Sequence, residues 1–253
     1  MKLGIDIGGT KIRAVLLSDK NKRIFAFNIE TPKSKKAFLK NLETEIIKII
    51  QKYEISGIGI GLPGIVDAKR GILIKAPHIQ FLKNWQAKKF FSKFNKNIEI
   101  ENDGRCFVLA EAKLGAGRNF KNIVGLTIGT GIGGGIIIDR KIYHGENNSA
   151  GEFGHIIIDN NKTFEQLSAK EAFIKYGDRS EIIGIGIANI INILNPDIVI
   201  LGGGGIISGK VNISTIRSIA KKYIMSSLAK NTPIVQGKLG EDSPAIGAAL
   251  LLK

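Results

Sequence analysis

Over the first thirty residues, apolar and polar positions alternate with the two-residue period of β-strands. This pattern predicts three strands, at residues 3–7, 12–17 and 23–29, joined by short turns. Between residues 34 and 53 the period changes to that of an amphipathic helix. Its apolar face would carry Phe38, Leu42, Ile46, Ile49 and Tyr53. The rest of this half is predicted to hold a strand at 56–62, an aromatic helix near 85–94, a strand at 98–101 and a helix at 103–114.

The second half of the chain repeats this order of elements. Strands are predicted at 123–128, 134–139 and 141–143, followed by an apolar helix at 179–194, a strand at 198–201, a helix at 213–229, a strand at 233–236 and a last helix at 243–251. Ser168 to Glu171 fit a capping box that would open a further short helix. The pattern therefore predicts two α/β lobes, residues 1–117 and 118–242, with the C-terminal helix (243–253) packing back on the first lobe.

The composition is that of a folded protein with an excess of glycine and of positive charge. The 253 residues are 43% hydrophobic and include 31 glycines, and 37 Lys and Arg against 22 Asp and Glu give a net charge of +15. A single cysteine, Cys106, excludes an internal disulfide and indicates a reducing, cytoplasmic location. No apolar run is long enough for a membrane span or a signal peptide. The charge fits either a scattered lysine bias or a polyanionic partner, and both explanations remain open.

The glycine clusters narrow the candidate chemistry. Gly59–Gly64 and Gly129–Gly134 both match G-x-G-x-x-G, but a turn or a strand follows each, whereas a dinucleotide fingerprint requires a helix. A P-loop pattern is absent as well. What remains is a tight strand–turn–strand loop in each predicted lobe, at 6–11 and 127–135. Glycine lets the backbone N–H groups of such a loop approach a phosphate. Either loop alone could be an ordinary hairpin, but one in each lobe favours phosphate binding.

Taken together, these segments resemble the ROK family of sugar kinases and regulators. The matching segments, in family order, are Gly4–Lys11, Gly61–Asp67, Glu101-Asn102-Asp103, Gly129–Gly135, Ala150–His155 and Gly202-Gly203-Gly204. The resemblance implies a two-lobed actin/hexokinase-like (ribonuclease H-like) α/β fold with a cleft between the lobes. It also implies a kinase that transfers the γ-phosphoryl group of ATP, with Mg²⁺, to the 6-hydroxyl of a hexose of the glucose or N-acetylhexosamine type.

The same resemblance implies roles for individual residues. Asp103 would be the general base for the sugar hydroxyl, and Asp6 would hold hydrated Mg²⁺. The residues expected at the sugar are Gly64, Asn102, Asp103, Glu152, His155 and Glu165. Those expected at the nucleotide are Asp6, Gly8, Gly9, Thr10, Lys11, Thr130, Gly131, Gly203 and Gly204. From the residues alone, Asn102 or Asp103 could equally be a helix N-cap, and Glu152 and His155 could belong to a structural turn.

The chain departs from the family pattern at two places. Typical members carry a cysteine-rich zinc insertion after the segment that ends at His155, whereas this chain has Asp159–Thr163 there. No structural zinc is therefore expected. His78 stands where the family usually has asparagine, which leaves that side of the sugar pocket undefined.

Two alternative functions remain. Inorganic polyphosphate could replace ATP as the donor, since relatives without the zinc insertion include such enzymes and a charge of +15 suits a polyanion. A sugar-sensing transcriptional regulator is the alternative from another class. Such regulators carry a helix-turn-helix domain ahead of the segment that here begins at Gly4, and the sequence leaves no room for it. Neither a nucleic acid nor a membrane is expected as a partner, while a homodimer is expected only by inheritance from the family.

Overall fold

The computed structural model describes all 253 residues, Met1–Lys253. The chain forms two compact units, one of Met1–Cys106 with Asp242–Lys253 and one of Phe107–Glu241. The contacts thus divide the chain inside helix α3 (Asp103–Leu114), whereas the sequence placed a boundary after residue 117. None of the helices has the length and apolar character needed to cross a bilayer.

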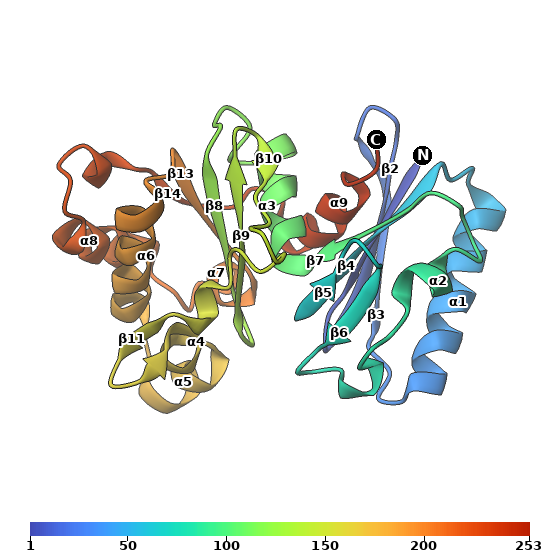
Figure 1. The fold of residues 1–253 in the computed structure, drawn as a ribbon, viewed down its shortest axis with the longest axis horizontal. Coiled ribbons are helices and arrows are strands. Elements are labelled where there is room, and N and C mark those ends of the chain that lie inside the picture. The colour runs from blue at the N-terminus through green and yellow to red at the C-terminus, as the bar shows by residue number, and fades with distance from the viewer. The chain divides into compact units, whose positions relative to one another are not determined.

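The first unit is built on a five-stranded sheet with the order β3-β2-β1-β4-β7 (Figure 1). The strands are β1 (Lys2–Ile7), β2 (Lys11–Leu17), β3 (Arg23–Glu30), β4 (Gly57–Leu62) and β7 (Ile98–Asn102). β2 runs antiparallel to β1 and β3, while β1, β4 and β7 are parallel. Because parallel strands end at the same edge, the carboxyl ends of these three strands lie beside the β1–β2 turn. All five strands were predicted from the sequence.

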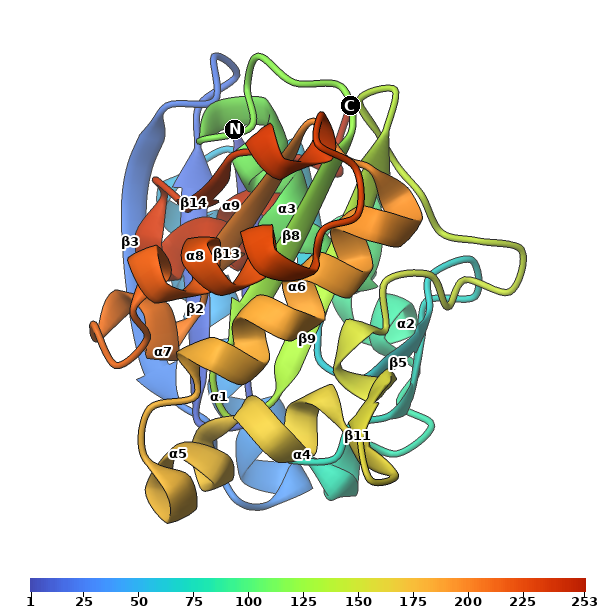
Figure 2. The same cartoon turned by 90° about the vertical axis from the view of Figure 1, so that its left-hand side faces the viewer.

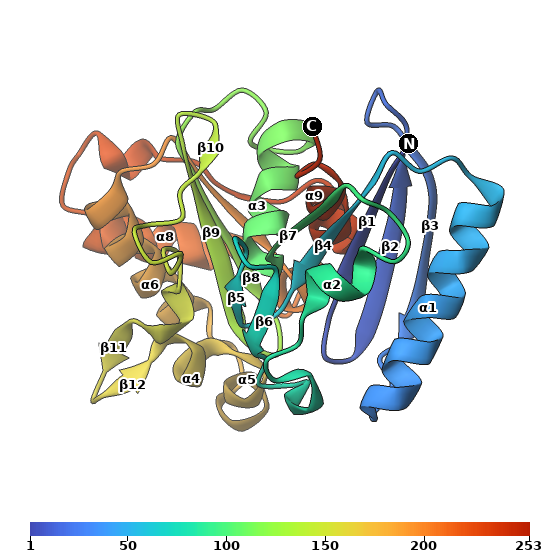
Figure 3. The ribbon, with the colours of Figure 1, turned by 45° about the vertical axis from the view of Figure 1, so that its right-hand side comes forward.

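Helices cover both faces of this sheet, as Figure 3 shows for α1 and α9. α1 (Lys35–Lys52) buries Phe38, Leu42, Ile46 and Ile49 in the same core as the β1 side chains Leu3, Ile5 and Ile7. α9 (Ser243–Ala249) packs on the opposite face, where Gly4 and Gly59 leave room for its backbone. The smaller elements are β5 (Ile65–Asp67), β6 (Ile72–Lys75), η1 (Gln80–Leu82), α2 (Ala87–Phe91) and η4 (Gly240–Asp242).

The second unit contains a sheet of the same plan, with the order β10-β9-β8-β13-β14. Its strands are β8 (Ile123–Ile128), β9 (Ile132–Ile138), β10 (Lys141–Ile142), β13 (Ile198–Gly202) and β14 (Ile234–Gln236). As in the first unit, the first three strands are antiparallel neighbours and the last two are parallel to the first. The repeated plan expected from the sequence is thus confirmed.

Helices α6 (Ser180–Leu194) and α8 (Ile213–Tyr223) lie on one face of the second sheet, in front of β8 and β13 in Figure 2. Phe107 and Val108 of α3 pack on the other face, against Ile123 and Ile200. The short elements are η2 (Phe153–His155), β11 (Ile157–Asp159), β12 (Lys162–Thr163), α4 (Phe164–Ser168), α5 (Lys170–Tyr176), α7 (Gly204–Ile207) and η3 (Ala229–Asn231).

The capping box lies five residues earlier than predicted. Thr163 accepts the backbone N–H of Gln166, and the Gln166 side chain accepts the N–H of Thr163. Ser168 instead ends α4 and donates its hydroxyl to the Phe164 carbonyl at 2.6 Å. The prediction over Ser168–Glu171 was therefore wrong, because two short helices follow one another here and α5 begins without a side-chain cap.

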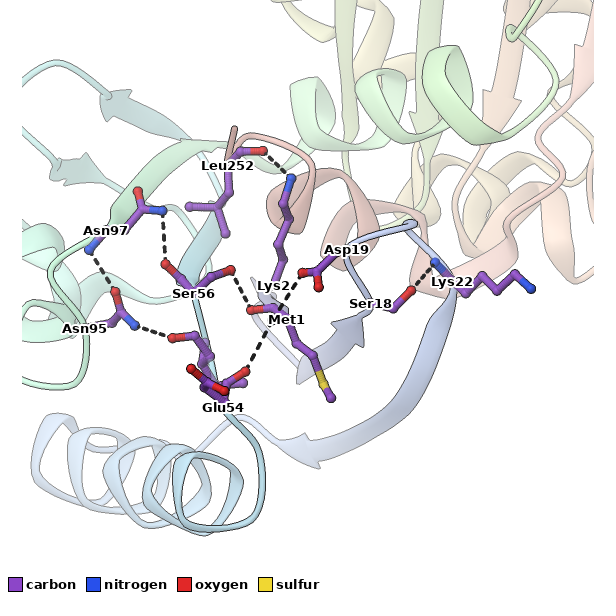
Figure 4. Close-up of polar contacts among 11 residues, drawn as sticks. Met1, Lys2, Ser18, Asp19, Lys22, Glu54, Ser56, Asn95, Asn97 and Leu252 are labelled. Atoms are coloured by element: carbon purple, nitrogen blue, oxygen red, sulfur yellow. Dashed lines mark hydrogen bonds and ion pairs between the residues drawn. The ribbon is translucent and has the colours of Figure 1, made fainter.

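The amino ends of the parallel strands in the first unit are fixed by a separate set of hydrogen bonds (Figure 4). Lys2 donates to the carbonyl of Leu252 at 2.8 Å, and both the N–H and the hydroxyl of Ser56 donate to the Met1 carbonyl. Asn97 donates to the Ser56 carbonyl at 3.2 Å. These bonds hold the strand starts in register, which leaves the opposite edge to the candidate site.

Candidate active site

Two acidic residues approach each other at the carboxyl edge of the first unit. Asp6 near the end of β1 pairs in register with Gly61 of β4, and Gly61 pairs with Glu101 of β7, two residues before Asp103. A Cβ atom at Gly61 would lie 3.6 Å from Oδ1 of Asp6 and 3.7 Å from Cα of Asp103. The absence of a side chain at Gly61 therefore lets the two acids share one small space.

Burial changes the protonation of Asp6. The residue is only 6% exposed, and this burial, together with the negative charge of Asp103, raises its pKa to about 8 against the opposing effect of Arg13. Arg13 is its cross-strand neighbour on β2. In the unliganded protein the Asp6 carboxyl is thus largely protonated at neutral pH. A cation at this place would favour its charged form.

Asn102 and Asp103 stand at the junction of β7 and α3. The Asn102 side chain accepts the N–H of Arg105 at 3.2 Å, and so it fills the N-cap role considered in the sequence. Its amide also donates to the Gly64 carbonyl at 3.1 Å. Asp103 accepts the N–H of Gly104 at 2.8 Å and is half-buried, so its carboxylate keeps access to solvent at the positive end of a helix.

A buried ion pair supports this junction from beneath. Glu101 and Arg105 are each 3% exposed and lie 3.1 Å apart, and Glu101 also accepts the N–H of Asn102 at 2.8 Å. Burial, together with the carboxylates of Glu101, Asp6 and Asp103, raises the pKa of the nearby Cys106 thiol well above its usual value. Cys106 is therefore an uncharged core residue beneath the site.

The β1–β2 turn is fixed by hydrogen bonds from a residue outside the hairpin, Thr31. Thr31 donates its N–H to the Thr10 carbonyl at 2.9 Å and its hydroxyl to the Gly8 carbonyl at 2.7 Å. Gly8 uses its own N–H inside the turn, on the Lys11 carbonyl at 2.9 Å. The N–H groups of Gly9 and Thr10, both exposed, are left for an anion.

In the second unit, the β8–β9 loop lies against Glu165. The loop closes through the N–H of Gly129 on the carbonyl of Gly131 at 2.9 Å. Glu165 accepts the N–H of Ile132 at 2.7 Å, and a side chain at Gly131 would collide with its carboxylate. Glu165 also lies beside Gly154, where a Cβ atom would be 3.5 Å from its Cβ. Glu165 therefore connects the predicted phosphate loop with the segment that carries Glu152 and His155.

That segment is anchored by its apolar residues and presents its polar ones. Phe153 is 7% exposed and packs against Gly134 of β9, and Gly151 adopts a φ of +91° against the same strand. Glu152 and His155, on either side of Phe153, are both exposed. Their side chains are thus available for a polar ligand such as a sugar hydroxyl.

A pocket of about 660 Å³ connects two of the predicted nucleotide segments within the second unit. Thr130 and Gly204 line it, whereas Gly131 and Gly203 are not among its lining residues. Gly203, the N-cap of α7, has a φ of +86°, and a side chain there would collide with the Ile128 backbone. The lining residues are Gly129, Thr130, Lys170, Phe173, Ile174, Gly177, Asp178, Gly204, Gly205, Ser208 and Lys210.

The sequence did not reveal several residues that the structure brings to these places. Lys170, Phe173 and Lys210 line the pocket, but their segments showed only helix and turn patterns. Gly61 was noticed as part of a glycine cluster, yet its position between two acids depends on strand register. The only local signal was the run of three glycines in Gly59–Gly64, which weakly indicates that other groups approach the backbone closely at Gly61.

Comparison with known proteins gives consistent matches over the whole chain. The ROK family model matches residues 2–170 and 162–253. The glucokinase of Thermotoga maritima is 27% identical over 306 residues, covering 99% of this chain and 96% of the relative. The N-acetyl-D-glucosamine kinase of Mannheimia succiniciproducens is 29% identical over 303 residues, covering 99% of each.

Solved structures agree on the fold. The ROK family glucokinase from Streptomyces griseus, in complex with glucose and AMPPNP, superimposes with a TM-score of 0.88 at 23% identity, covering 99% of this chain and 98% of that one. The actin/hexokinase-like fold expected from the sequence is thus confirmed.

The raised pKa of Asp6 predicts a specific effect of pH on stability. Between its ordinary value of 3.8 and about 8, Asp6 is ionised in the unfolded chain but protonated in the folded one. Over this range, titration of Asp6 makes the free energy of unfolding fall as the pH rises, by at most about 1.4 kcal/mol per pH unit. Asp6→Asn removes the titration, so the variant should gain stability relative to the natural protein as pH rises from 4 to 8, and no further above 8.

Urea unfolding at several pH values would measure this difference. Glu99→Gln, at an exposed position of β7, serves as the control and should follow the natural protein throughout. A stability difference for Asp6→Asn that stays constant from pH 4 to 8 would contradict the assignment.

Proposed function

Because the chain belongs to the ROK family and is a sugar kinase, we propose that it transfers the γ-phosphoryl group of ATP to the 6-hydroxyl of a hexose of the glucose or N-acetylhexosamine type. The observation that carries this proposal is the approach of Asp6 and Asp103 across Gly61, beside a glycine turn with exposed N–H groups. It supports the proposal because a carboxylate that can accept a proton lies at the same edge of the first unit as a turn that can bind an anion.

In the proposed reaction, Asp103 is the general base. Its half-buried carboxylate takes the proton of the 6-hydroxyl as the oxygen bonds to the γ-phosphorus. The bond from that phosphorus to the β–γ bridging oxygen breaks, and ADP leaves with the electron pair. The proton passes from Asp103 to solvent with the departure of the sugar phosphate. Since such transfers depend on positioning and electrostatics, the N–H groups of Gly9 and Thr10 and the Lys11 ammonium would stabilise the phosphoryl oxygens.

The residues around Asp6 fit a magnesium ion. Its carboxyl is buried beside a second acid, which raises its pKa, and a nearby cation would lower that pKa and favour the charged form that binds a metal. Mg²⁺ is usually held by one or two carboxylates together with substrate phosphates and water. Asp6 would hold it through water, and the bound ion would neutralise charge on the donor phosphates.

Each unit offers groups that can bind a sugar hydroxyl. In the first, the Asn102 amide is fixed next to the Gly64 carbonyl. In the second, Glu152 and His155 are exposed on one short turn and can bind vicinal hydroxyls. The relatives named above act on glucose and on N-acetylglucosamine, so these two sugars are the first to test.

The proposed role of Asp103 predicts a loss of turnover without a loss of folding. Asp103→Asn should lower kcat by roughly 10²–10⁴-fold, because the amide cannot accept the proton. A coupled assay of ADP release with glucose and with N-acetylglucosamine would measure it. Glu99→Gln, at an exposed position of the preceding strand β7, should keep full activity. An Asp103→Asn enzyme with normal kcat would exclude Asp103 as the base.

Glu165 allows a test between two roles. The family resemblance implies that Glu165 binds the sugar. In the structure, the Glu165 carboxylate accepts the N–H of Ile132, which suggests that it positions the β8–β9 loop. Glutamine can accept the same bond, so Glu165→Gln should keep the donor KM near normal. Glu165→Ala should raise that KM, by roughly tenfold for a lost charge-assisted bond. If both variants change the KM of the sugar alone, the loop-positioning role is wrong and the sugar role is favoured.

Polyphosphate is the second candidate donor, favoured by the charge of the first unit. That unit holds 22 Lys and Arg against 11 Asp and Glu, whereas the second holds 15 against 11. Thr31, which holds the β1–β2 turn, is followed by the exposed Lys33, Lys35 and Lys36. An extended polyanion leaving the turn would meet these lysines.

If polyphosphate is used, Lys35→Gln/Lys36→Gln should lower kcat/KM for polyphosphate several-fold and leave that for ATP unchanged. The reference variant is Lys20→Gln/Lys22→Gln, in the β2–β3 turn at the opposite end of the hairpin. Both donors are assayed at low and high salt, because screening weakens contacts between exposed charges. Absence of turnover with polyphosphate in the natural enzyme excludes this candidate.

A further inference from the structure

The segment 75–78 connects two parts of the first-unit site. At one end, Gly64 has a φ of +77°, and a side chain there would collide with the carbonyl of Lys75 and lie 3.2 Å from Cδ of Pro77. At the other end, a Cβ atom on Gly9 would lie 2.6 Å from Cβ of His78 and 3.5 Å from its Cγ. His78 therefore packs directly on the tip of the β1–β2 turn.

With this segment, the contacts of the site form a closed circle. The turn leads along β1 to Asp6, which meets Asp103 at Gly61, and the neighbouring Asn102 is bonded to Gly64. From Gly64 the segment 75–78 returns to Gly9. The residues of this circle include those to which the proposed reaction assigns the hydroxyl and the phosphoryl group. Within this circle, His78 is the residue of the segment 75–78 that contacts the β1–β2 turn.

The local fold fixes His78 but leaves its ring available. Ala76 and Ile79, on either side, are 2% and 1% exposed in the core of the unit, and the Ile79 N–H donates to the Ala76 carbonyl at 3.2 Å. Both anchors keep the backbone of residue 78 in place. His78 itself is exposed, and its imidazole makes no hydrogen bond within the protein. An imidazole always offers at least one N–H donor.

We propose that His78 is a phosphate ligand of the active site, which donates an imidazole N–H to the terminal phosphate of the donor at the Gly9–Thr10 turn. The proposal rests on the proposed function for the identity of the donor, but it follows from the contact of His78 with Gly9. A donor at this point would add to the backbone N–H groups and stabilise the oxygens of the transferred group.

Phosphate binding can be tested without turnover. Tripolyphosphate is titrated into the natural protein, His78→Ala, His78→Asn and Gln80→Ala by calorimetry. Gln80 is an exposed residue two positions further on, at the start of η1, and the atoms nearest to Gly9 all belong to His78, so Gln80→Ala should bind normally. His78→Ala should raise the Kd by roughly tenfold, the effect of a lost hydrogen bond to a charged group, and His78→Asn should recover part of it, because asparagine keeps an N–H donor.

Proton NMR gives a readout that a purely structural role would not change. The chain has three histidines, so the His78 ring signals can be assigned by their loss in His78→Asn. These signals should shift on addition of tripolyphosphate. Unshifted signals, or an unchanged Kd for His78→Ala, would overturn the proposal.

The kinase assay separates this proposal from the proposed function. With an active natural enzyme, His78→Ala should lower kcat/KM for the donor by about the same factor and leave the KM of the sugar unchanged. An effect confined to the KM of the sugar would make His78 a sugar ligand and overturn the phosphate role. A natural enzyme that phosphorylates no sugar but binds tripolyphosphate through His78 would refute the proposed function and retain this inference.

Discussion

The close approach of Asp6 and Asp103 is the constraint around which the first unit is arranged. Burial, and after it the negative charge of Asp103, raises the pKa of Asp6, so the charged form of this carboxyl is unfavourable here. The fold maintains this approach because β1 and β4 are paired along their whole length and because Gly61 adds no side chain between them. A cation beside Asp6 would favour its charged form, which is why the proposed function assigns the magnesium ion to this position.

Several glycines on the same face of the sheet are required by helix packing. Gly4 and Gly59 share the Asp6 face of the sheet, and at both positions a side chain would collide with the α9 backbone. Gly247 of α9 in turn passes directly over the Cys106 carbonyl at the start of α3. The helix can approach the sheet closely only because these residues lack side chains. Some of the glycines therefore serve helix packing beneath the site and not contact with a ligand.

The fold could be predicted from the sequence where the hydrophobic pattern was regular, and less well where tertiary contacts decide. The strand period of residues 3–29 and the helical stripe from Phe38 to Ile49 are local signals, and both were confirmed. Helix α8 ends at Tyr223 and not at residue 229, because Asn192 of α6 binds the backbone at Tyr223 and Met225 and turns the chain away. The contact of His78 with Gly9 joins residues far apart in sequence, and no local pattern encodes it.

Comparison of the two units shows how one architecture supports two kinds of site. Thr127 of β8 occupies the place that Asp6 has on β1, since it pairs with Gly202 of β13 as Asp6 pairs with Gly61. In the second unit, however, a side chain at Gly202 would meet the ring of Phe107 and not an acid. The equivalent position is thus neutral and packed against an apolar side chain. The plan of the sheet supplies a glycine turn in both units, but only in the first unit does an acidic residue, Asp6, stand at this position before the turn.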